Sequence, residues 1–596
     1  MFEKMKRSLC LVLTAAMLLS MTACGKDKEE NTEEDASNID PNQSTVAVKA
    51  ADNLFSLGYD PDASLNPLST KSSANYIVDC LVYEFAVELD RDYNPIPNII
   101  SAWDTDNGVS WFFTIDTGIT FHDGTNVTAA DVAYSLNRAR SSDIYSARLN
   151  KIWGISAMDE DTLMITLADT NYMFPRCLNI PVVKANSDSK TPPGTGPYIF
   201  NEDKTQLVKY EEYRHVEDTP IDVIYLQPNG TPEEKIADYS TSVLDLVIND
   251  PTGLSRLGFG NNNEIRHFPT TNMQYIGFNM EGDFTCYSTY RYAFNYIVDR
   301  QYIVNNILSG SASVATLPIS PVNPLYNKGM ADRYKFDRVM ALNALNGAGV
   351  QDYDADEILE YQLPGGIAEI ELDFVVPSDN TDKVKAAKRI AEDLASIGVP
   401  VKIRQLSWTD YLNAIVEGDY DMFYGEIRLT ADFNLTDMLT TNGLKNFYNI
   451  SDPNMYEVIH AFLSAPSETE RRQMCDAMCQ YIVDQAPIIP ICFEEQQVLT
   501  HRDVVSGLEP TQFNVFYNFR NWTINLGDGV EKKLAKEQAR LEAEQESENE
   551  AEGQEGKDAE QGVEVTPAPT ATPAPTPSPE PSQSPEETGE TPEAQG

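Results

Sequence analysis

The sequence predicts an α/β protein with more than one packing unit. Strand-like and helix-like patterns alternate from Ile370 to Tyr424, as in the β-α-β-α-β unit of a doubly wound sheet. The chain has 596 residues, too many for a single hydrophobic core. Its apolar content of 41% is ample for a globular body. Sheets of this kind bind ligands beyond the carboxyl ends of their strands.

Three strands and two helices make up this unit, and a glycine marks the end of each helix. We predict strands over 369–376, 399–403 and 420–424, and helices over 382–397 and 409–416. Apolar residues of the first helix recur at helical spacing, beginning with Val384 and Ala387. Gly398 and Gly418 follow the helices in the position where a left-handed residue closes a helix.

Shorter elements are predicted earlier in the chain. We expect helices over 76–86 and 131–140, strands over 111–115 and 119–121, and a turn over 194–198 that leads into a strand. Thr128 is a candidate N-cap of the second helix. Thr117 and Gly118 provide the turn between the two strands.

The N-terminus has the parts of a secretory signal peptide. Basic residues at positions 4, 6 and 7 precede an apolar run from Leu9 to Met21, which is too short to span a membrane comfortably. The run ends in Met-Thr-Ala-Cys24, which resembles a bacterial lipobox, in which the cysteine receives a lipid. We therefore predict a signal peptide over 1–23 and lipidation of Cys24. The alternative is an ordinary signal peptide followed by an incidental cysteine.

Polar segments flank the predicted body of the chain. Residues 24–44 are acidic and nearly free of apolar side chains, so we expect a flexible tether between lipid and body. Residues 528–596 form an acidic tail whose last part is rich in Pro and Thr, and we expect this tail to be disordered.

The charge of the chain is strongly acidic. It contains 44 basic and 92 acidic residues, for a net charge of −48. A field of this sign repels nucleic acid and anionic membrane surfaces, so we expect no nucleic-acid partner. It also disfavours anionic ligands and is compatible with neutral or cationic ones. A general role in solubility outside the cell explains the same composition.

No motif indicates a metal site, a cofactor or catalysis. The cysteines of the body show no disulfide or metal-ligand spacing, so we expect buried thiols. The five histidines are scattered, and no Gly-x-Ser-x-Gly elbow is present. The segment 104–108 looks like part of a calcium loop, but it lacks the later glutamate and is interpreted as a hairpin turn. We therefore predict a protein without metal or cofactor that is not an enzyme.

Several short motifs, taken in order, resemble the oligopeptide- and dipeptide-binding proteins of ABC importers. The resemblance covers roughly residues 46–527. The motifs are Ser-Ala-Trp at 101–103, Phe-His-Asp-Gly at 121–124 with Thr-Ala-Ala-Asp-Val at 128–132, Gly-Thr-Gly-Pro-Tyr at 194–198, Tyr-Ile-Gly-Phe-Asn at 275–279, RYAFNYIVDR at 291–300, and Ala486-Pro487 with Ile489-Pro490. Each motif is weak alone, but their order behind a lipobox is specific.

The resemblance implies a periplasmic-binding-protein-like fold with two lobes around a ligand cleft. An extra domain is inserted in lobe I of such proteins. By analogy, lobe I takes 45–71, 191–269 and 493–527, the inserted domain takes 72–190, and lobe II takes 270–492.

The resemblance also implies candidate ligand-binding residues. The stretch Ala431-Asp432-Phe433-Asn434 resembles the family's Ala-Asp-Tyr-Asn, whose aspartate meets the α-ammonium of a peptide. That role falls on Asp432, with Phe433 beside it; the alternative is an aspartate that caps a turn. Arg428 either pairs with a ligand carboxylate or with Glu426 or another acid. Asn279 either binds the ligand backbone or stabilises its own turn.

Together, these expectations predict a protein that captures peptides for an ABC transporter by closure of its two lobes. Its expected partners are a peptide ligand, the transporter permease and the membrane, through the lipid on Cys24. We expect a monomer on the extracytoplasmic face of the bacterial cell membrane. Alternatives are the same fold binding a nickel complex, an oligosaccharide or another small solute, a receptor for a peptide signal, and a secreted hydrolase.

Overall fold

The computed structural model describes residues 54–187, 190–253, 257–259 and 263–526. The predicted signal peptide over 1–23, the tether over 24–44 with Cys24, and the tail over 528–596 lie outside the described residues. Within the described ranges, no helix combines the length and the apolar character that a membrane crossing requires.

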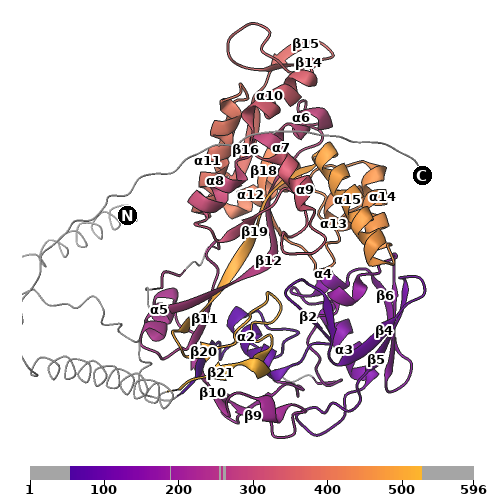
Figure 1. Cartoon of the computed structure of the whole chain (residues 1–596), viewed down its shortest axis with the longest axis vertical. Coiled ribbons are helices and arrows are strands. Elements are labelled where there is room, and N and C mark those ends of the chain that lie inside the picture. The colour runs from indigo at the N-terminus through magenta and orange to yellow at the C-terminus, as the bar shows by residue number, and fades with distance from the viewer. Residues whose placement is uncertain (1–53, 188–189, 254–256, 260–262, 527–596) are drawn as a thin grey trace, which may run out of the picture. The chain divides into compact units, whose positions relative to one another are not determined.

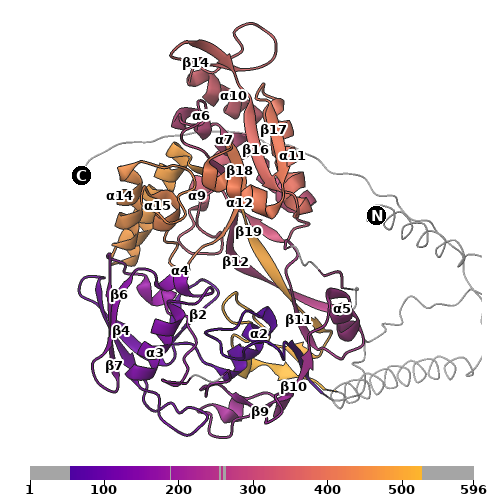
Figure 2. The same cartoon turned by 180° about the vertical axis from the view of Figure 1, so that it is seen from behind.

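One large mixed sheet runs through the described part of the chain. Its strands follow the order β17-β16-β18-β12-β19-β11-β1-β10-β9-β8, and β13 also pairs with β19. The bounds are β1 Ser56–Tyr59, β8 Tyr198–Phe200, β9 Gln206–Lys209, β10 Val223–Pro228, β11 Leu246–Asn249, β12 Asn263–Phe278, β13 Ala312–Val314, β16 Leu372–Pro377, β17 Val401–Leu406, β18 Met422–Arg428 and β19 Ile488–His501. Figures 1 and 2 show the two longest strands, β12 and β19, lying side by side.

The doubly wound unit predicted over 369–424 is confirmed. Strand β16 is parallel to both β17 and β18, and helices α11 (Thr381–Ala395) and α12 (Trp408–Glu417) connect them. Gly398 and Gly418 have φ values of +83° and +72°, as expected of residues that close helices. Some details differ. The first two strands lie at Leu372–Pro377 and Val401–Leu406, not at the predicted 369–376 and 399–403, and Ser407 caps α12 in place of the predicted Thr409. Strand β18 continues to Arg428 because β12 pairs along its whole length.

A second, four-stranded sheet lies between residues 100 and 167. Its order is β4-β5-β7-β6, with bounds β4 Ile100–Asp104, β5 Ser110–Ile115, β6 Ile152–Ala157 and β7 Thr162–Leu167. Helix α3 (Ala129–Ala139) begins after Thr128, whose backbone N–H donates to the Asp131 carboxylate at 2.9 Å. The predicted strand over 119–121 is wrong, because this segment forms only an isolated bridge between Thr120 and Asn126.

The remaining elements are short strands and further helices, of which α15 is the longest, with 18 residues. The strands are β2 Val87–Leu89, β3 Pro95–Pro97, β14 Glu360–Leu363, β15 Gly366–Glu369, β20 Val505–Ser506 and β21 Thr523–Ile524. The helices are α2 Ser73–Val82, α4 Ser146–Leu149, α5 Pro232–Ser240, α6 Ser288–Tyr292, α7 Phe294–Ile297, α8 Arg300–Tyr302, α9 Lys328–Ala331, α10 Arg338–Gly347, α13 Thr436–Leu439, α14 Pro453–Leu463 and α15 Glu468–Gln485.

The Gly-Thr-Gly-Pro-Tyr segment packs directly against the end of α2. A Cβ atom on Gly194 would lie 2.1 Å from the carbonyl oxygen of Val82, and one on Gly196 would lie 2.6 Å from that of Leu81. Only glycine fits so close to another backbone. The predicted strand after this turn is β8, which confirms the expectation.

Two hydrophobic cores lie on either side of the middle of β12 and β19. The first core contains residues from 55 to 268 and from 498 to 522, and the second contains mainly residues from 273 to 493. Phe268 and Val498 belong to the first core, whereas Met273 and Phe493 belong to the second. Strands β12 and β19 are therefore the crossing strands between the two cores. Their register is irregular between Pro269 and Met273.

The described cysteines are all free thiols. Cys177, Cys475, Cys479 and Cys492 are buried, which confirms the expectation for these four. Cys286 is exposed, and Cys80 is half-buried.

Candidate ligand-binding site

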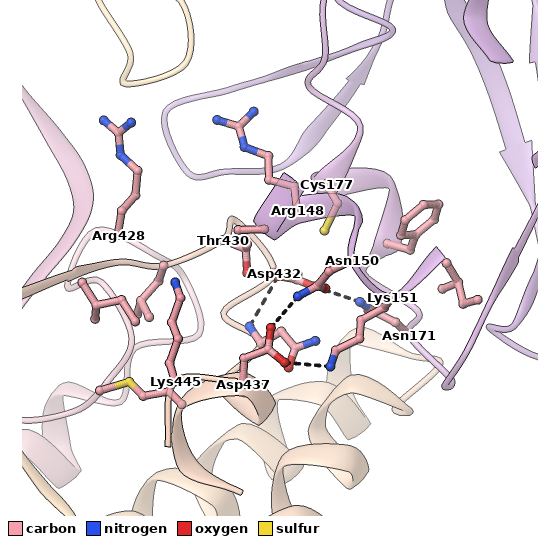
Figure 3. Close-up of a pocket in the computed structure, with 17 residues that line it drawn as sticks. Arg148, Asn150, Lys151, Asn171, Cys177, Arg428, Thr430, Asp432, Asp437 and Lys445 are labelled. Carbon is pink, nitrogen blue, oxygen red and sulfur yellow. Dashed lines mark hydrogen bonds and ion pairs between the residues drawn. The ribbon is translucent and has the colours of Figure 1, made fainter. Parts of the chain in front are cut away.

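A pocket brings residues near α4 together with residues that follow β18. We call it the Asp432 pocket. One side is formed by residues between 147 and 177, and the other by residues between 427 and 445. Its polar and charged lining side chains are Arg148, Asn150, Lys151, Asn171, Arg428, Thr430, Asp432, Asn434, Asp437 and Lys445. Figure 3 shows these segments facing one another.

Asp432 is buried at this pocket, with only 2% of its surface exposed. One carboxylate oxygen accepts from Asn171 Nδ2 at 2.8 Å. The other accepts from the Thr430 hydroxyl at 2.5 Å and from the Asn434 backbone N–H at 3.4 Å. All these donors are neutral, and no described cation lies within ion-pair distance of the carboxylate. A buried carboxylate without a cation favours a positively charged partner.

Arg428 ends β18 and also lines the pocket. Its Nε donates to Asn272 Oδ1 on β12 at 3.2 Å. Glu426, which sequence reasoning offered as an ion-pair partner, is instead paired with Lys383 at 2.5 Å. Desolvation by the surrounding protein, together with the positive charge of Arg148, lowers the pKa of Arg428, although this side chain stays exposed at the end of β18. Arg428 therefore presents a guanidinium group that no described carboxylate neutralises.

Phe433 does not line the pocket, in contrast to its predicted role as a ligand contact. Its side chain is fully buried in the second core, at 0% exposure. Its ring meets Tyr93 edge-on, with centroids 5.8 Å apart. The aromatic position after Asp432 is thus occupied by a core residue that supports the loop.

Asn279 lies away from the pocket, just beyond the opposite end of the β12–β18 pair. Its Nδ2 donates to the Gly418 carbonyl at 3.0 Å, and its Oδ1 accepts from the Glu281 N–H and from Asn449 Nδ2. These contacts stabilise its own turn, which is one of the two interpretations left open by the sequence. The structure does not bring Asn279 together with Asp432.

Sequence reasoning missed the part of the pocket that precedes residue 180. Asn171 reaches Asp432 across 261 positions of sequence. Asn150 and Lys151 hold Asp437 at 2.5 and 2.8 Å. Arg148 carries no motif, and only the fold places it beside Arg428. Common polar residues on irregular segments give no periodic signal from which such a site can be predicted.

A buried polar network connects the pocket to the crossing strands. Asn272, which accepts from Arg428, donates to Glu494 on β19 at 3.2 Å, and Gln274 donates to the same carboxylate at 2.6 Å. The Tyr424 hydroxyl donates to Gln274 Oε1 at 2.7 Å. Burial and the nearby charges of Glu426 and Asp250 raise the pKa of Glu494 to about 7.

Away from this pocket, one group of four acidic side chains comes together after α10. The oxygens of Asp352, Asp354, Asp356 and Glu360 lie within 4.8 Å of one another. The three aspartates are exposed and Glu360 is buried. Such acidic groups are common on protein surfaces, and we assign no cation site to this one.

Comparisons with known proteins agree on the family. Residues 94–446 match the model for the middle part of the bacterial extracellular solute-binding proteins, family 5. Heme-binding protein A of Haemophilus influenzae is 24% identical over 82% of this chain and 94% of its own length. Oligopeptide-binding protein AppA of Bacillus subtilis is 23% identical over 70% of this chain and 80% of its own length.

A solved structure shows the same fold. The periplasmic murein tripeptide binding protein MppA, in its unliganded open form, superposes with a TM-score of 0.65 at 20% identity, over 80% of this chain and 98% of its own. The two-lobed α/β fold expected from the sequence is thus confirmed. The family consists of solute-binding proteins that act outside the cytoplasm, not of enzymes. The chain belongs to family 5 of the bacterial extracellular solute-binding proteins.

Proposed function

We propose that this protein is a lipid-anchored receptor that captures peptides and delivers them to an ABC transporter permease, without catalysis. The observation that carries the proposal is the buried Asp432 carboxylate, which has no described cation within ion-pair distance and shares one pocket with Arg428, whose guanidinium pairs with no described carboxylate. A peptide supplies the complementary charges, an α-ammonium for Asp432 and a carboxylate for Arg428. The names of two relatives, an oligopeptide-binding and a murein tripeptide binding protein, support this ligand class.

The proposed domains are lobe I over 45–71, 191–269 and 493–527, an inserted domain over 72–190 and lobe II over 270–492. The change from one hydrophobic core to the other between Phe268 and Met273, and between Phe493 and Val498, supports the two lobe boundaries. Closure of the lobes by bending of the crossing strands would enclose the peptide.

Replacement of Asp432 by asparagine tests this proposal. The variant retains an oxygen for Asn171, and its amide can donate to the Thr430 hydroxyl, so we expect the fold to be maintained. Loss of a partly hydrated charge pair costs about 2 kcal/mol, or about 30-fold in affinity. We therefore expect Asp432→Asn to weaken peptide binding by about 30-fold, and N-acetylation of the peptide to weaken binding to the wild type similarly.

Calorimetry measures the affinity of the wild type and of the Asp432→Asn variant for the free and for the N-acetylated peptide. The four affinities give the coupling free energy between the mutation and the acetylation. The peptides are first identified by native mass spectrometry, as ligands retained by the purified protein. We expect the Asp432→Asn variant to discriminate little between the free and the acetylated form. Additive effects of the mutation and the acetylation would show that Asp432 does not hold the ammonium. Retention of a non-peptide solute, such as a heme, would overturn the ligand class.

A further inference from the structure

The Asp432 pocket contains more positive charge than its own acids can neutralise. Four cationic side chains line it, namely Arg148, Lys151, Arg428 and Lys445, against the two acids Asp432 and Asp437. Lys151 and Asp437 neutralise each other in an ion pair of 2.8 Å. Within the described ranges, no acid lies within 4.0 Å of the charged atoms of the other three cations. The remaining lining is therefore cationic, with Asp432 as the single opposing charge.

The two arginines are held in place by neutral groups. Arg148 donates through Nη1 to the Asn179 carbonyl at 2.7 Å, and its guanidinium lies over the rings of Tyr145 and Phe513 at 5.4 and 5.2 Å. Among the residues that the structure describes, Asn272 alone holds Arg428, through its Nε. Each guanidinium therefore retains unused N–H donors in a fixed orientation, as bidentate carboxylate binding requires.

The positive charges of Arg148 and Arg428 repel each other across the pocket. Arg148 contributes to the lowered pKa of Arg428, and the charges of both arginines also act on Tyr76 of α2. Figure 3 shows both guanidinium groups extending in the same direction, away from Asp437. Two adjacent cations without an anion are unfavourable, and a bound carboxylate relieves their repulsion.

We propose that the pocket selects acidic peptides, in which carboxylates outnumber ammonium groups. This inference rests on the proposed peptide-binding function. One ammonium is satisfied by Asp432, and the three cations then offer charge to additional carboxylates, such as a C-terminus and a Glu or Asp side chain. The net charge of −48 predicted the opposite preference. Charges beyond about 8–10 Å are screened by physiological salt, so the lining of the pocket decides affinity, and the overall charge only slows the approach of an anion.

A pool of sequence-matched peptides that differ in charge tests this preference for acidic peptides. Tripeptides in Glu and Gln pairs, otherwise identical, are mixed with the protein, and the retained members are quantified by native mass spectrometry. We expect the wild type to enrich Glu members over their Gln partners by about 10-fold or more. Arg148→Gln and Arg428→Gln should each reduce this ratio toward one. Arg138→Gln, an exposed arginine on α3 outside the pocket, is the matched control and should leave the ratio unchanged.

The outcomes separate this inference from the proposed function. Equal retention of Glu and Gln peptides would overturn the acidic preference and leave peptide capture standing. Retention of no peptide would overturn peptide capture, and the acidic preference with it. Melting temperatures identify an arginine variant that fails to fold, in which case Lys445→Gln, at an exposed position, provides the same comparison. A ratio that is unchanged in the folded arginine and lysine variants would also overturn the inference.

Discussion

Phe433 combines a fully buried ring with a left-handed backbone, at φ of +51°. A bulky residue rarely adopts this conformation, and the surrounding packing has to offset its cost. We expect Phe433→Ala to lower the free energy of unfolding by about 3–5 kcal/mol, as for other buried phenylalanines. Urea unfolding measures this loss.

The control for this experiment is Phe112→Ala on β5, where the ring is 47% exposed and the cost should be much smaller. If Phe433→Ala left stability intact and reduced ligand affinity instead, the ring would be a ligand contact after all.

Some pocket residues could be predicted from the sequence and others could not, and the two groups differ in the kind of element that carries them. Asp432 follows a predictable strand, so both its position and its role could be proposed from its neighbours in sequence. Asn171 and Arg148 enter the pocket from irregular segments or a four-residue helix, and only tertiary contacts place them there. A buried ring such as Phe433 is equally hard to assign, because an aromatic residue suits a binding site as well as a core.

At the scale of elements, the crossing strands contain an unusual carboxylate. Glu494 on β19 is 3% exposed, and its pKa is raised to about 7, above the value near 4.3 of an unfolded chain. The folded state therefore binds the proton more tightly than the unfolded state does. The stability linked to this proton is fully present below about pH 4.5 and is lost as the pH rises through 7.

This linkage predicts a pH-dependent difference between the wild type and Glu494→Gln. A pKa difference of this size corresponds to about 3 kcal/mol, and the variant has no charge to bury. We expect the variant to gain about 3 kcal/mol of stability relative to the wild type between pH 5 and pH 8. Denaturant unfolding at several pH values measures the gain. A constant difference across this range would mean that Glu494 titrates normally.

Elements with a complete local pattern were predictable, whereas strand lengths were not. The helices α11 and α12 and the parallel strands between them follow from periodicity and from glycine at the helix ends. The full length of β12, 16 residues, does not follow from its own pattern. It continues because β19 pairs with most of its length and β18 with its last seven residues, and partners 144 or more residues away give no local signal.

At the scale of the whole molecule, the lipid anchor that we propose on Cys24 would decide location. The Met-Thr-Ala-Cys24 sequence predicts that Cys24→Ala releases the protein from the membrane fraction into the medium or the soluble fraction. Fractionation followed by immunoblotting measures this change, with Cys286→Ala as a matched cysteine control that should remain membrane-bound. Persistence of the Cys24→Ala variant in the membrane fraction would exclude lipidation of this cysteine as the anchor.

The placement of β19 also sets the order in which the chain can fold during synthesis. This strand pairs with β11, β12 and β13, yet it lies at residues 488–501. The central part of the large sheet therefore lacks a strand until the ribosome has made about five-sixths of the chain, since synthesis proceeds from the N-terminus. Such non-local pairing also folds slowly. A polypeptide that completes its central sheet so late stays unfolded long enough to pass through a secretion channel. This topology therefore suits export before folding.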